Sequence, residues 1–439
     1  MVSTGSSTFM NFRDDLHEAS EWAASYLDRV GELPVAAETR PGDVRAALPA
    51  APPERGEPFS AVLRDLDEKL LPAITHWNHP RFFAWFATTG SEPGILAELL
   101  ISALNVNAMT WLAAPAATEL ETTVLDWLAQ LLGLPREWHG HLEDTASTST
   151  VAALAAAREL RPGGVVYASE QANFSVEKAA RLVGLEFRTV ETNDTFRMRA
   201  DFPLADATAV VATVGTTGTT AVDPVPELAA RCAEAGVWLH VDAAYAGSAA
   251  VCPELRWCLD GCERADSVVV NPHKWLFTPM DCSALWTRRP DALHRAFSLV
   301  PDYLAATADA VDLKDYGPAL GRRFRALKLW TVLRMYGAAG LRGLIREHVR
   351  LAQLFASWVE ADDEWEIAAP HPFSTVCFRH RTADNAELAR RATATGEIFV
   401  ATTKLRGVPT IRLAIGNART TEDDVSRAWE VLRECATAP

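Results

Sequence analysis

Six short apolar runs between residues 164 and 288 constrain the fold of this chain more than any other feature. Segments with helical spacing separate the runs, so strands and helices should alternate. Most of the runs are apolar throughout instead of alternating with polar residues, which implies burial on both faces of a sheet. The pattern predicts a wound α/β domain with a mainly parallel sheet. The six runs are GVVYAS, LEFRTV, ATAVVATVG, GVWLHVDAA, SVVVN and CSALWT.

The region before this domain has the pattern of an arm. Apolar residues from Leu16 to Val30 recur at helical spacing, and the stretch LPAAPPERGEP at 48–58 holds too much proline for regular structure. Residues 1 to about 60 therefore look like an arm with one amphipathic helix. A helix with a single apolar stripe has no core of its own, so we expect it to dock on the main domain or on a second subunit.

Two further helical regions flank the predicted sheet. Thr118 and Glu121 have the spacing of a capping box, before a helix that ends at Gly133. After residue 327 comes a long helical stretch, then strand candidates at STVCFRH, GEIFVATT and PTIRLAIG, and a last helix, TEDDVSRAWEVLREC. This order predicts a smaller α+β domain at the end of the chain.

The composition narrows the classes of partner. The chain has 439 residues, of which 49% are hydrophobic, so it can bury large cores and form two or three domains. Its formal charge of -15 argues against nucleic acid or an anionic membrane as partners. The chain has no long uncharged apolar run, and its start lacks the pattern of a secretory signal, so we expect a cytoplasmic protein. Seven scattered cysteines predict buried thiols, with neither a disulfide framework nor a metal site.

Two ionisable residues follow predicted strands. Asp242 ends the run VWLHVD, and Lys274 follows SVVVNPH. In an open parallel sheet ligands bind beyond the carboxyl ends of the strands, so these groups could face one crevice. Residues at strand ends are usually solvated, but Lys274 is bracketed by His273, Trp275, Leu276 and Phe277. Such surroundings favour a neutral, nucleophilic amine of the kind that forms Schiff bases.

A third element is a cluster of hydroxyl residues from Thr145 to Thr150 that opens a helix. A plain helix cap needs only one of these residues, so we favour an anion site made by hydroxyls and free amides. The loop TVGTTGTT after the strand ATAVVA can also approach a ligand closely. Lysine, strand-end carboxylate and phosphate cradle together match pyridoxal phosphate.

The sequence resembles the group II pyridoxal-phosphate decarboxylases, the family of aromatic-amino-acid decarboxylases. The resemblance runs from about residue 10 to the last helix and is carried by NPHKWLF, HVDAAYAG, HPRFF, PAATELE, LGRRFRALKLW and IRLAIGN. It implies a fold type I enzyme of the aspartate-aminotransferase kind, with a mainly parallel seven-stranded sheet in a large domain and a small α+β C-terminal domain. It also implies a homodimer with active sites at the subunit interface. On this basis residues 1–91 form the N-terminal helical arm or dimerisation segment, 92–327 the cofactor-binding domain and 328–439 the small domain.

The resemblance also assigns roles. Lys274 would hold pyridoxal 5'-phosphate, Asp242 would pair with the ring nitrogen, and Tyr303 would protonate the carbanion after carbon dioxide leaves. Asn173 stands where the family usually has a histidine over the ring. The remaining cofactor contacts would be Ala146, Ser147, Thr217, Ala244, Asn271 and His273. The side-chain pocket, partly from the other subunit, would contain Trp77, Trp85, Phe86, Ala87, Asn107 and Met109. Trp85 and Phe86 favour an aromatic amino acid as substrate.

Three departures from the family pattern affect these expectations. The asparagine at 173 is characteristic of insect aldehyde synthases of the family, which couple decarboxylation to oxidative deamination by dioxygen. We nevertheless expect an amine as product, because Tyr303 is retained; the alternatives are an aldehyde synthase and a catalytically silent scaffold. Glu143 and Asp144 replace part of a glycine-rich stretch and should repel phosphate unless they point away. The loop after Tyr303 is also shorter than in the family, so its closure is in doubt.

Overall fold

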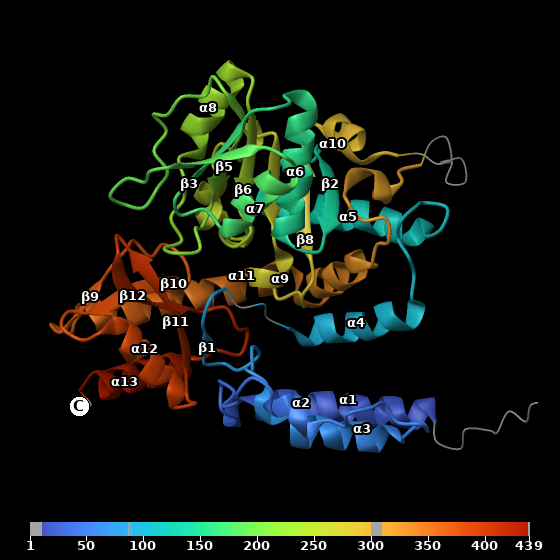
Figure 1. Cartoon of the computed structure of the whole chain (residues 1–439), viewed down its shortest axis with the longest axis vertical. Coiled ribbons are helices and arrows are strands. Elements are labelled where there is room, and N and C mark those ends of the chain that lie inside the picture. Colours follow the sequence, from blue (N-terminus) through green and yellow to red (C-terminus); the bar gives the residue numbers. More distant parts are fainter. Residues whose placement is uncertain (1–10, 87, 89, 300–309, 438–439) are drawn as a thin grey trace, which may run out of the picture.

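The computed structural model describes residues 11–86, 88, 90–299 and 310–437. Its main feature is a seven-stranded sheet with the order β2, β8, β7, β6, β5, β3, β4 (Figure 1). Strand β8 is antiparallel to both of its neighbours, and the other adjacent pairs are parallel. The predicted mainly parallel seven-stranded sheet is therefore confirmed. The strands are β2 (His139–Glu143), β3 (Val165–Ser169), β4 (Glu186–Val190), β5 (Ala207–Thr213), β6 (Trp238–Asp242), β7 (Ser267–Val270) and β8 (Ser283–Thr287).

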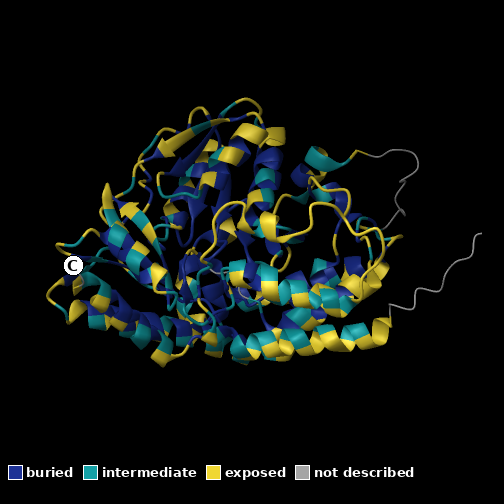
Figure 2. Cartoon of the chain, turned by 60° about the horizontal axis from the view of Figure 1, so that its bottom comes forward, coloured by how far each residue is buried: buried dark blue, intermediate teal, exposed yellow. Residues whose placement is uncertain are grey.

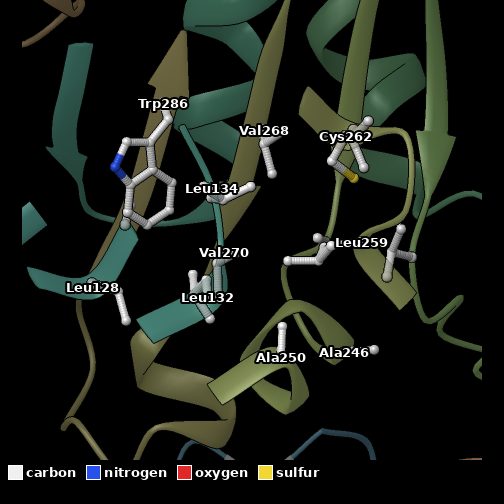
Figure 3. Close-up of a cluster of buried hydrophobic side chains, with 14 of the residues drawn as sticks. Leu128, Leu132, Leu134, Ala246, Ala250, Leu259, Cys262, Val268, Val270 and Trp286 are labelled. Atoms are coloured by element: carbon white, nitrogen blue, oxygen red, sulfur yellow. The ribbon is translucent and has the colours of Figure 1, made fainter. Parts of the chain in front are cut away.

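Helices cover both faces of this sheet, which explains the apolar runs. Along β5, Val210 packs in one core, and its neighbours Ala209 and Val211 pack in another. The first core, part of which Figure 3 shows around Leu128 and Val268, contains α5, α8, several short helices and the start of α11. The second core contains α6, α7 and α10. The helices are α5 (Pro115–Leu132), α6 (Ala146–Leu160), α7 (Phe174–Leu182), α8 (Val225–Ala235), η4 (Ala246–Val251), η5 (Pro253–Leu259), η6 (Cys262–Arg264) and α10 (Pro290–Phe297).

A second sheet of five strands, with the order β1, β11, β12, β10, β9, forms the C-terminal part (Figure 1). Its three predicted strands are confirmed, whereas β9 and the short β1 were not foreseen. Strand β1 comes from the N-terminal region and pairs in parallel with β11. The long helix α11 joins the two parts and is interrupted at Gly337, where φ is 61°. The elements are β1 (Phe82–Phe83), α11 (Arg325–Glu360), β9 (Trp365–Ile367), β10 (Thr375–His380), α12 (Asn385–Ala394), β11 (Phe399–Leu405), β12 (Val408–Ala414) and α13 (Glu422–Thr437).

The predicted N-terminal helix is present as α1 (Phe12–Arg29) and has no buried residue. Its apolar stripe is half-buried against the segment that follows: Trp22 Nε1 donates to Asp67 Oδ1 at 2.9 Å, and the Tyr26 hydroxyl lies 2.8 Å from His76 Nδ1. Figure 2 shows the arm helices as intermediate and exposed, while much of the central sheet is buried. The other arm elements are η1 (Val30–Glu32), α2 (Asp43–Ala47), α3 (Phe59–Asp65), η2 (Leu66–Leu70) and η3 (Leu71–Ala73).

The predicted capping box at Thr118 and Glu121 is wrong. Helix α5 begins three residues earlier, at Pro115, where the ring supplies a favourable first helical residue. The Thr118 hydroxyl donates to the carbonyl oxygen of Ala114 at 3.2 Å, and the Glu121 carboxylate accepts from the backbone N–H of Leu142 at 2.9 Å. The predicted helix end at Gly133 is confirmed, because this residue has a left-handed φ of 80°.

Helix α4 (Glu92–Leu104) and the one-turn elements α9 (Pro272–Trp275) and η8 (Leu313–Tyr316) complete the fold. Across the described ranges, no helix is long and apolar enough to cross a membrane. All seven cysteines are free thiols, and six of them are buried as predicted. The division at residues 91 and 327 remains a prediction; α11 begins before the second boundary.

Candidate active site

A cavity of about 270 Å³ lies beyond the carboxyl ends of β5, β6 and β7. This is the position at which open parallel sheets bind ligands. All nine residues predicted as cofactor contacts line the cavity, although they come from α6, α7, α9 and three strand ends. These residues are Ala146, Ser147, Asn173, Thr217, Asp242, Ala244, Asn271, His273 and Lys274.

Lys274 lies on the short helix α9, directly after β7. Its Nζ atom is 5.5 Å from the centroid of the Phe86 ring. Burial lowers the pKa of Lys274; the Asp242 carboxylate opposes this shift, and the Arg412 guanidinium adds to it. A lower pKa increases the share of neutral amine, which is the form that attacks a carbonyl carbon.

Asp242 is the last residue of β6, and only 5% of its surface is exposed. Its Oδ1 accepts a hydrogen bond from the backbone N–H of Ala244 at 3.1 Å, which fixes the carboxylate. The neighbouring strands place Thr213 and Asn271 beside it in the cavity wall. The strand-end carboxylate and the lysine therefore face the same cavity, as the sequence predicted.

The start of α6 forms another wall of the cavity. The helix begins at Ala146 within the predicted hydroxyl cluster, and no described side chain caps it. The first amides of a helix lack intrahelical partners and carry partial positive charge, so this end suits a phosphate. Two buried atoms of the cavity wall, Thr213 Oγ1 and Asn271 Oδ1, also have no partner in the described parts of the chain. Buried polar groups are normally paired, so these residues fit a polar ligand.

His273 supplies a hydrogen-bond donor to the same wall. The backbone N–H of Cys282 donates to His273 Nδ1 at 2.9 Å, and burial lowers the pKa of His273 to about 3. The neutral ring therefore carries its proton on Nε2. This atom lies 3.3 Å from Nδ2 of Asn271, which is also a donor. The His273 ring and the Asn271 amide therefore both present polar atoms to the cavity, which suits them to a polar ligand group.

Asn173 is held at the cavity by two hydrogen bonds. Its Oδ1 accepts from the backbone N–H of Ser175 at 3.0 Å and so caps the N-terminus of α7. Its Nδ2 donates to Thr217 Oγ1 at 3.3 Å. The side chain therefore has a fixed amide orientation and also positions the Thr217 hydroxyl.

The expected repulsion of phosphate by Glu143 and Asp144 is not supported by their positions. Neither residue lines the cavity. Glu143 is buried at the end of β2, where its Oε1 lies 3.3 Å from His141 Nε2. The Asp144 carboxylate accepts from the backbone N–H and the hydroxyl of Thr145, at 2.5 and 3.1 Å. Neither carboxylate therefore faces the cavity: Thr145 engages Asp144, and Glu143 is buried beside His141 at the end of β2.

The predicted substrate-pocket residues divide into two groups. Phe86 lines the cavity and stacks on Tyr245 at 3.7 Å between ring centroids. The other four described residues lie elsewhere on this chain: Trp85 is 48% exposed and stacks with Trp77, and Asn107 bonds to the backbone N–H of Arg322 and to Met109. A role for these four in the site of a second subunit remains a prediction. Ala87 and Tyr303 fall outside the described residues.

Sequence reasoning missed several residues at the site. Phe174 and Met280 line the cavity although 78% and 59% of their surfaces are exposed. Arg412 lies behind Phe86, with its guanidinium carbon 4.3 Å from the ring centroid. Its Nη1 donates to the carbonyl oxygen of Trp85 at 2.6 Å, whereas Nε and Nη2 are buried with no partner in the described chain. The motifs HVDAAYAG and IRLAIGN contain Tyr245 and Arg412, so position within a motif could have indicated these two.

A buried amine, a strand-end carboxylate and an uncapped helix start around one cavity define a class of protein: a fold type I enzyme that uses pyridoxal phosphate. Comparison with known proteins narrows the class. Residues 41–381 match the model of the pyridoxal-dependent decarboxylase conserved domain. This match covers more than half of the chain, and the chain therefore belongs to the pyridoxal-dependent decarboxylase family.

Characterised relatives and solved structures agree with this assignment. The chain is 39% identical to tyrosine decarboxylase 4 of Petroselinum crispum, over 97% of this chain and 93% of the relative. It is 38% identical to a phenylacetaldehyde synthase of a Rosa hybrid cultivar, over 97% and 94%. The structure of Oryza sativa TDC with PLP and tryptamine matches with a TM-score of 0.94 at 37% identity, covering 98% of this chain and 99% of that one.

Proposed function

We propose that this enzyme decarboxylates an aromatic L-amino acid to the corresponding amine and carbon dioxide. The observation that carries the proposal is the shared cavity of Lys274 and Asp242, with Phe86 in its wall. Relatives over nearly the whole chain include tyrosine and tryptophan decarboxylases. The enzyme is pyridoxal-phosphate-dependent, as its family membership shows.

The residues of the cavity have distinct tasks in this proposal. Lys274 would hold the cofactor, Asp242 would keep a proton on the ring nitrogen, and the start of α6 with His273 and Asn271 would bind the phosphate. Bound pyridoxal phosphate supplies an electron sink for the carbon that loses carbon dioxide. Tyr303 remains our predicted donor of the proton that replaces the carboxyl group. The sequence resemblance is the support for this role.

An aromatic substrate suits the apolar part of the cavity. Phe86 and Tyr245 form a parallel stack, with 9° between the ring planes, and Phe174 and Met280 stand exposed at the cavity. Flat apolar side chains gain most from such surfaces. The test is to incubate the holoenzyme with each of the twenty amino acids and analyse amines and aldehydes together. We expect an amine from tryptophan, tyrosine or phenylalanine; an amine from glutamate or aspartate alone would contradict the proposed substrate class.

An aldehyde synthase is the second candidate, because Asn173 occupies the position of the usual histidine. Its amide is held by Ser175 and Thr217 and does not titrate near neutral pH. A relative and a solved structure that match the chain are aldehyde synthases. Oxygen uptake with stoichiometric hydrogen peroxide and no amine would establish this activity. If the native enzyme makes aldehyde, we expect Asn173→His to shift the product toward amine, and an unchanged ratio would deny Asn173 this role.

We also propose a homodimer in the cytoplasm. Exposed apolar side chains on α4, together with the half-buried stripe of α1, support a subunit interface on this side of the molecule. Phe174 and Met280, exposed at the cavity, are suited to contact with a second subunit. Light scattering on the purified holoenzyme tests the oligomer: a monomer at micromolar concentration would contradict it. The exposed α4 residues are Leu96, Leu99, Leu100 and Leu104.

A further inference from the structure

A second hollow, distinct from the catalytic cavity, lies between the large domain and the C-terminal part of the chain. Its volume is about 460 Å³, against about 270 Å³ for the catalytic cavity. Four segments that are distant in sequence line it, near Arg197, Thr219, Trp257 and Pro370. We call it the Trp257 groove. Small-molecule sites typically have volumes of roughly 300–1,000 Å³ and often lie between domains, so the groove has the size and location of a ligand site.

Trp257 gives the groove an aromatic platform. The indole stacks on Phe373, with ring centroids 5.6 Å apart and 10° between the planes, and Phe373 is fully buried. One side of the indole is therefore held by the core, yet 44% of the Trp257 surface remains exposed. Pro370 and Pro372 border the same space with rigid apolar rings. A fixed, half-exposed indole suits stacking with another aromatic ring.

A positive and a negative side chain also line the Trp257 groove. Arg197 and Asp260 both line the groove. Arg197 also acts on the buried Asp223 of the groove wall: burial raises the pKa of that carboxyl to about 6, and Arg197 opposes this shift. The Nε atom of Arg197 donates to the carbonyl oxygen of Val222 at 2.7 Å, which anchors the guanidinium. The buried Asp223 carboxylate is already engaged, because it accepts from the backbone N–H groups of Met198 and Thr213, both at 2.7 Å. The groove thus offers one aromatic face, one exposed cation, Arg197, and, besides the buried Asp223, one exposed carboxylate, Asp260.

We propose that the Trp257 groove is a second binding site, for a zwitterionic aromatic amino acid. The ligand ring stacks on Trp257, its carboxylate is bound by Arg197, and its ammonium is bound by Asp260. An aromatic amine would contact only Trp257 and Asp260. An aromatic acid would contact only Trp257 and Arg197. A ligand that carries both charged groups can contact Trp257, Arg197 and Asp260 together.

The groove shares a loop with the catalytic cavity. Thr219 and Ala221 line the groove, whereas Gly215 and Thr217 of the same turn line the catalytic cavity. The turn is internally bonded: the backbone N–H of Gly215 donates to the carbonyl oxygen of Ala221 at 3.0 Å, and the Thr216 and Thr219 hydroxyls lie 3.1 Å apart. Because Thr217 in turn holds Asn173, a ligand in the groove acts on a turn that positions active-site groups.

The first test separates this site from the catalytic one. Borohydride reduces the bond between cofactor and lysine in the holoenzyme, so that the amine can no longer exchange with an amino acid. We expect calorimetry with L-phenylalanine to show binding to this reduced enzyme, at least tenfold weaker binding in Trp257→Leu, and near-native binding in the matched control Trp257→Phe. Absence of binding, or equal affinity in Trp257→Leu, would overturn the proposal. Since no turnover is needed, failure of the proposed decarboxylation would not affect this result.

A second test assigns the two ends of the ligand. Phenethylamine should bind at least fivefold more weakly to Asp260→Asn and normally to Arg197→Gln, and 3-phenylpropionate should show the reverse. Both variants change exposed side chains, so folding should be preserved. Unaltered binding of both probes to both variants would show that Asp260 and Arg197 do not contact the ligand.

A third test concerns the turn that the groove shares with the catalytic cavity. We expect L-phenylalanine to change the fluorescence of the reduced cofactor in the native chain. A constant fluorescence signal would show that binding in the groove does not affect the catalytic cavity.

Discussion

Two regions of the central sheet bury polar groups without complete pairing, and they differ in what surrounds those groups. At the candidate active-site cavity, Thr213 and Asn271 have unpaired atoms beside Lys274 and Asp242. At the β2 edge of the sheet, a set that we call the β2 cluster has unpaired atoms as well, on His141, Glu143 and Arg322. The β2 cluster consists of Glu121, His141, Glu143 and Arg322, all buried.

The β2 cluster is filled with protein, whereas the catalytic cavity contains open space. Arg322 donates to Glu121 Oε1 at 2.7 Å and contacts His141, so the main charges compensate each other. The backbone of Gly317 closes over Glu143, since a Cβ on this glycine would lie 2.0 Å from Oε1. Buried ionisable groups with unpaired atoms are therefore not sufficient evidence for a catalytic site. A cavity beside them makes the difference, and four substitutions can test this distinction.

The largest effect is expected for Lys274→Ala. Removing the amine that we propose to hold the cofactor should lower activity by about 10⁴-fold or more, as for other essential nucleophiles. Cofactor absorbance fixed to the protein by borohydride should disappear, while the unfolding midpoint of the apoenzyme stays near that of the native apoenzyme. Lys178→Ala, at an exposed lysine of α7, is the matched control and should retain full activity. Activity retained by Lys274→Ala would end the assignment of the cavity as the active site.

Arg322→Met should affect stability instead of chemistry. The substitution leaves Glu121 buried without its cation, which costs about 3–5 kcal/mol. Urea unfolding of the holoenzyme measures the loss, and activity per folded molecule should remain near native. The control Arg323→Met removes a half-exposed partner of Glu98 and should cost about 1 kcal/mol or less. Lost activity in an Arg322→Met enzyme of native stability would place the cluster in the catalytic machinery.

Glu143→Gln tests the same cluster through pH. Burial raises the pKa of Glu143 from its usual 4.5 to about 7; Arg322 opposes this shift and Asp144 adds to it. Between these values the folded chain keeps a proton that the unfolded chain has lost, so stability falls as pH rises from 4.5 to 7 and then levels off. Glutamine cannot titrate, so the variant should lose this slope and gain about 3 kcal/mol relative to the native chain above pH 7.

Urea midpoints between pH 5 and 8 measure this slope, with the exposed Glu137→Gln as the control. Parallel curves for Glu143→Gln and the native chain would mean that Glu143 is ionised throughout this range in the folded protein. The cluster would then hold two carboxylates against a single guanidinium, contrary to the charge balance described here.

The smallest effect is expected for Phe174→Ser. Phe174 lies at the cavity with most of its ring exposed, so it should contribute to aromatic substrate binding and little to folding. One aromatic contact is worth about 0.5–1.5 kcal/mol, which corresponds to a roughly 2- to 13-fold lower kcat/KM. Leu182→Ser, at an exposed position of the same helix, serves as the control. Equal kcat/KM for Phe174→Ser and Leu182→Ser would show that Phe174 does not contribute to substrate binding.

The sequence predicted the central strands well because they are continuously apolar. Strand β2 escaped prediction, since His139, His141 and Glu143 give it a polar character that only tertiary burial makes compatible with a sheet. The capping box failed for a related reason. Local spacing matched at Thr118 and Glu121, but Pro115 starts the helix and Glu121 serves the β2 cluster instead.

At the candidate site, sequence could predict residues that follow strands or open helices. Lys274, Asp242 and the start of α6 were found in this way because their places follow from the topology of a parallel sheet. Arg412 and Phe174 were not found. Arg412 reaches the site from the second sheet, so only its place in the motif IRLAIGN could have indicated it. The exposed position of Phe174 depends on how α7 begins and does not follow from local pattern.

Strand β1 has a practical consequence for any shortened form of this protein. Phe82 and Phe83 cover the outer edge of β11 by pairing with Phe399 and Val400. Cutting the chain at residue 91, where the arm was expected to end, would strip that cover and leave an apolar strand edge able to pair with other chains. A version lacking the arm is therefore expected to aggregate, even though Lys274 is distant in sequence from the cut.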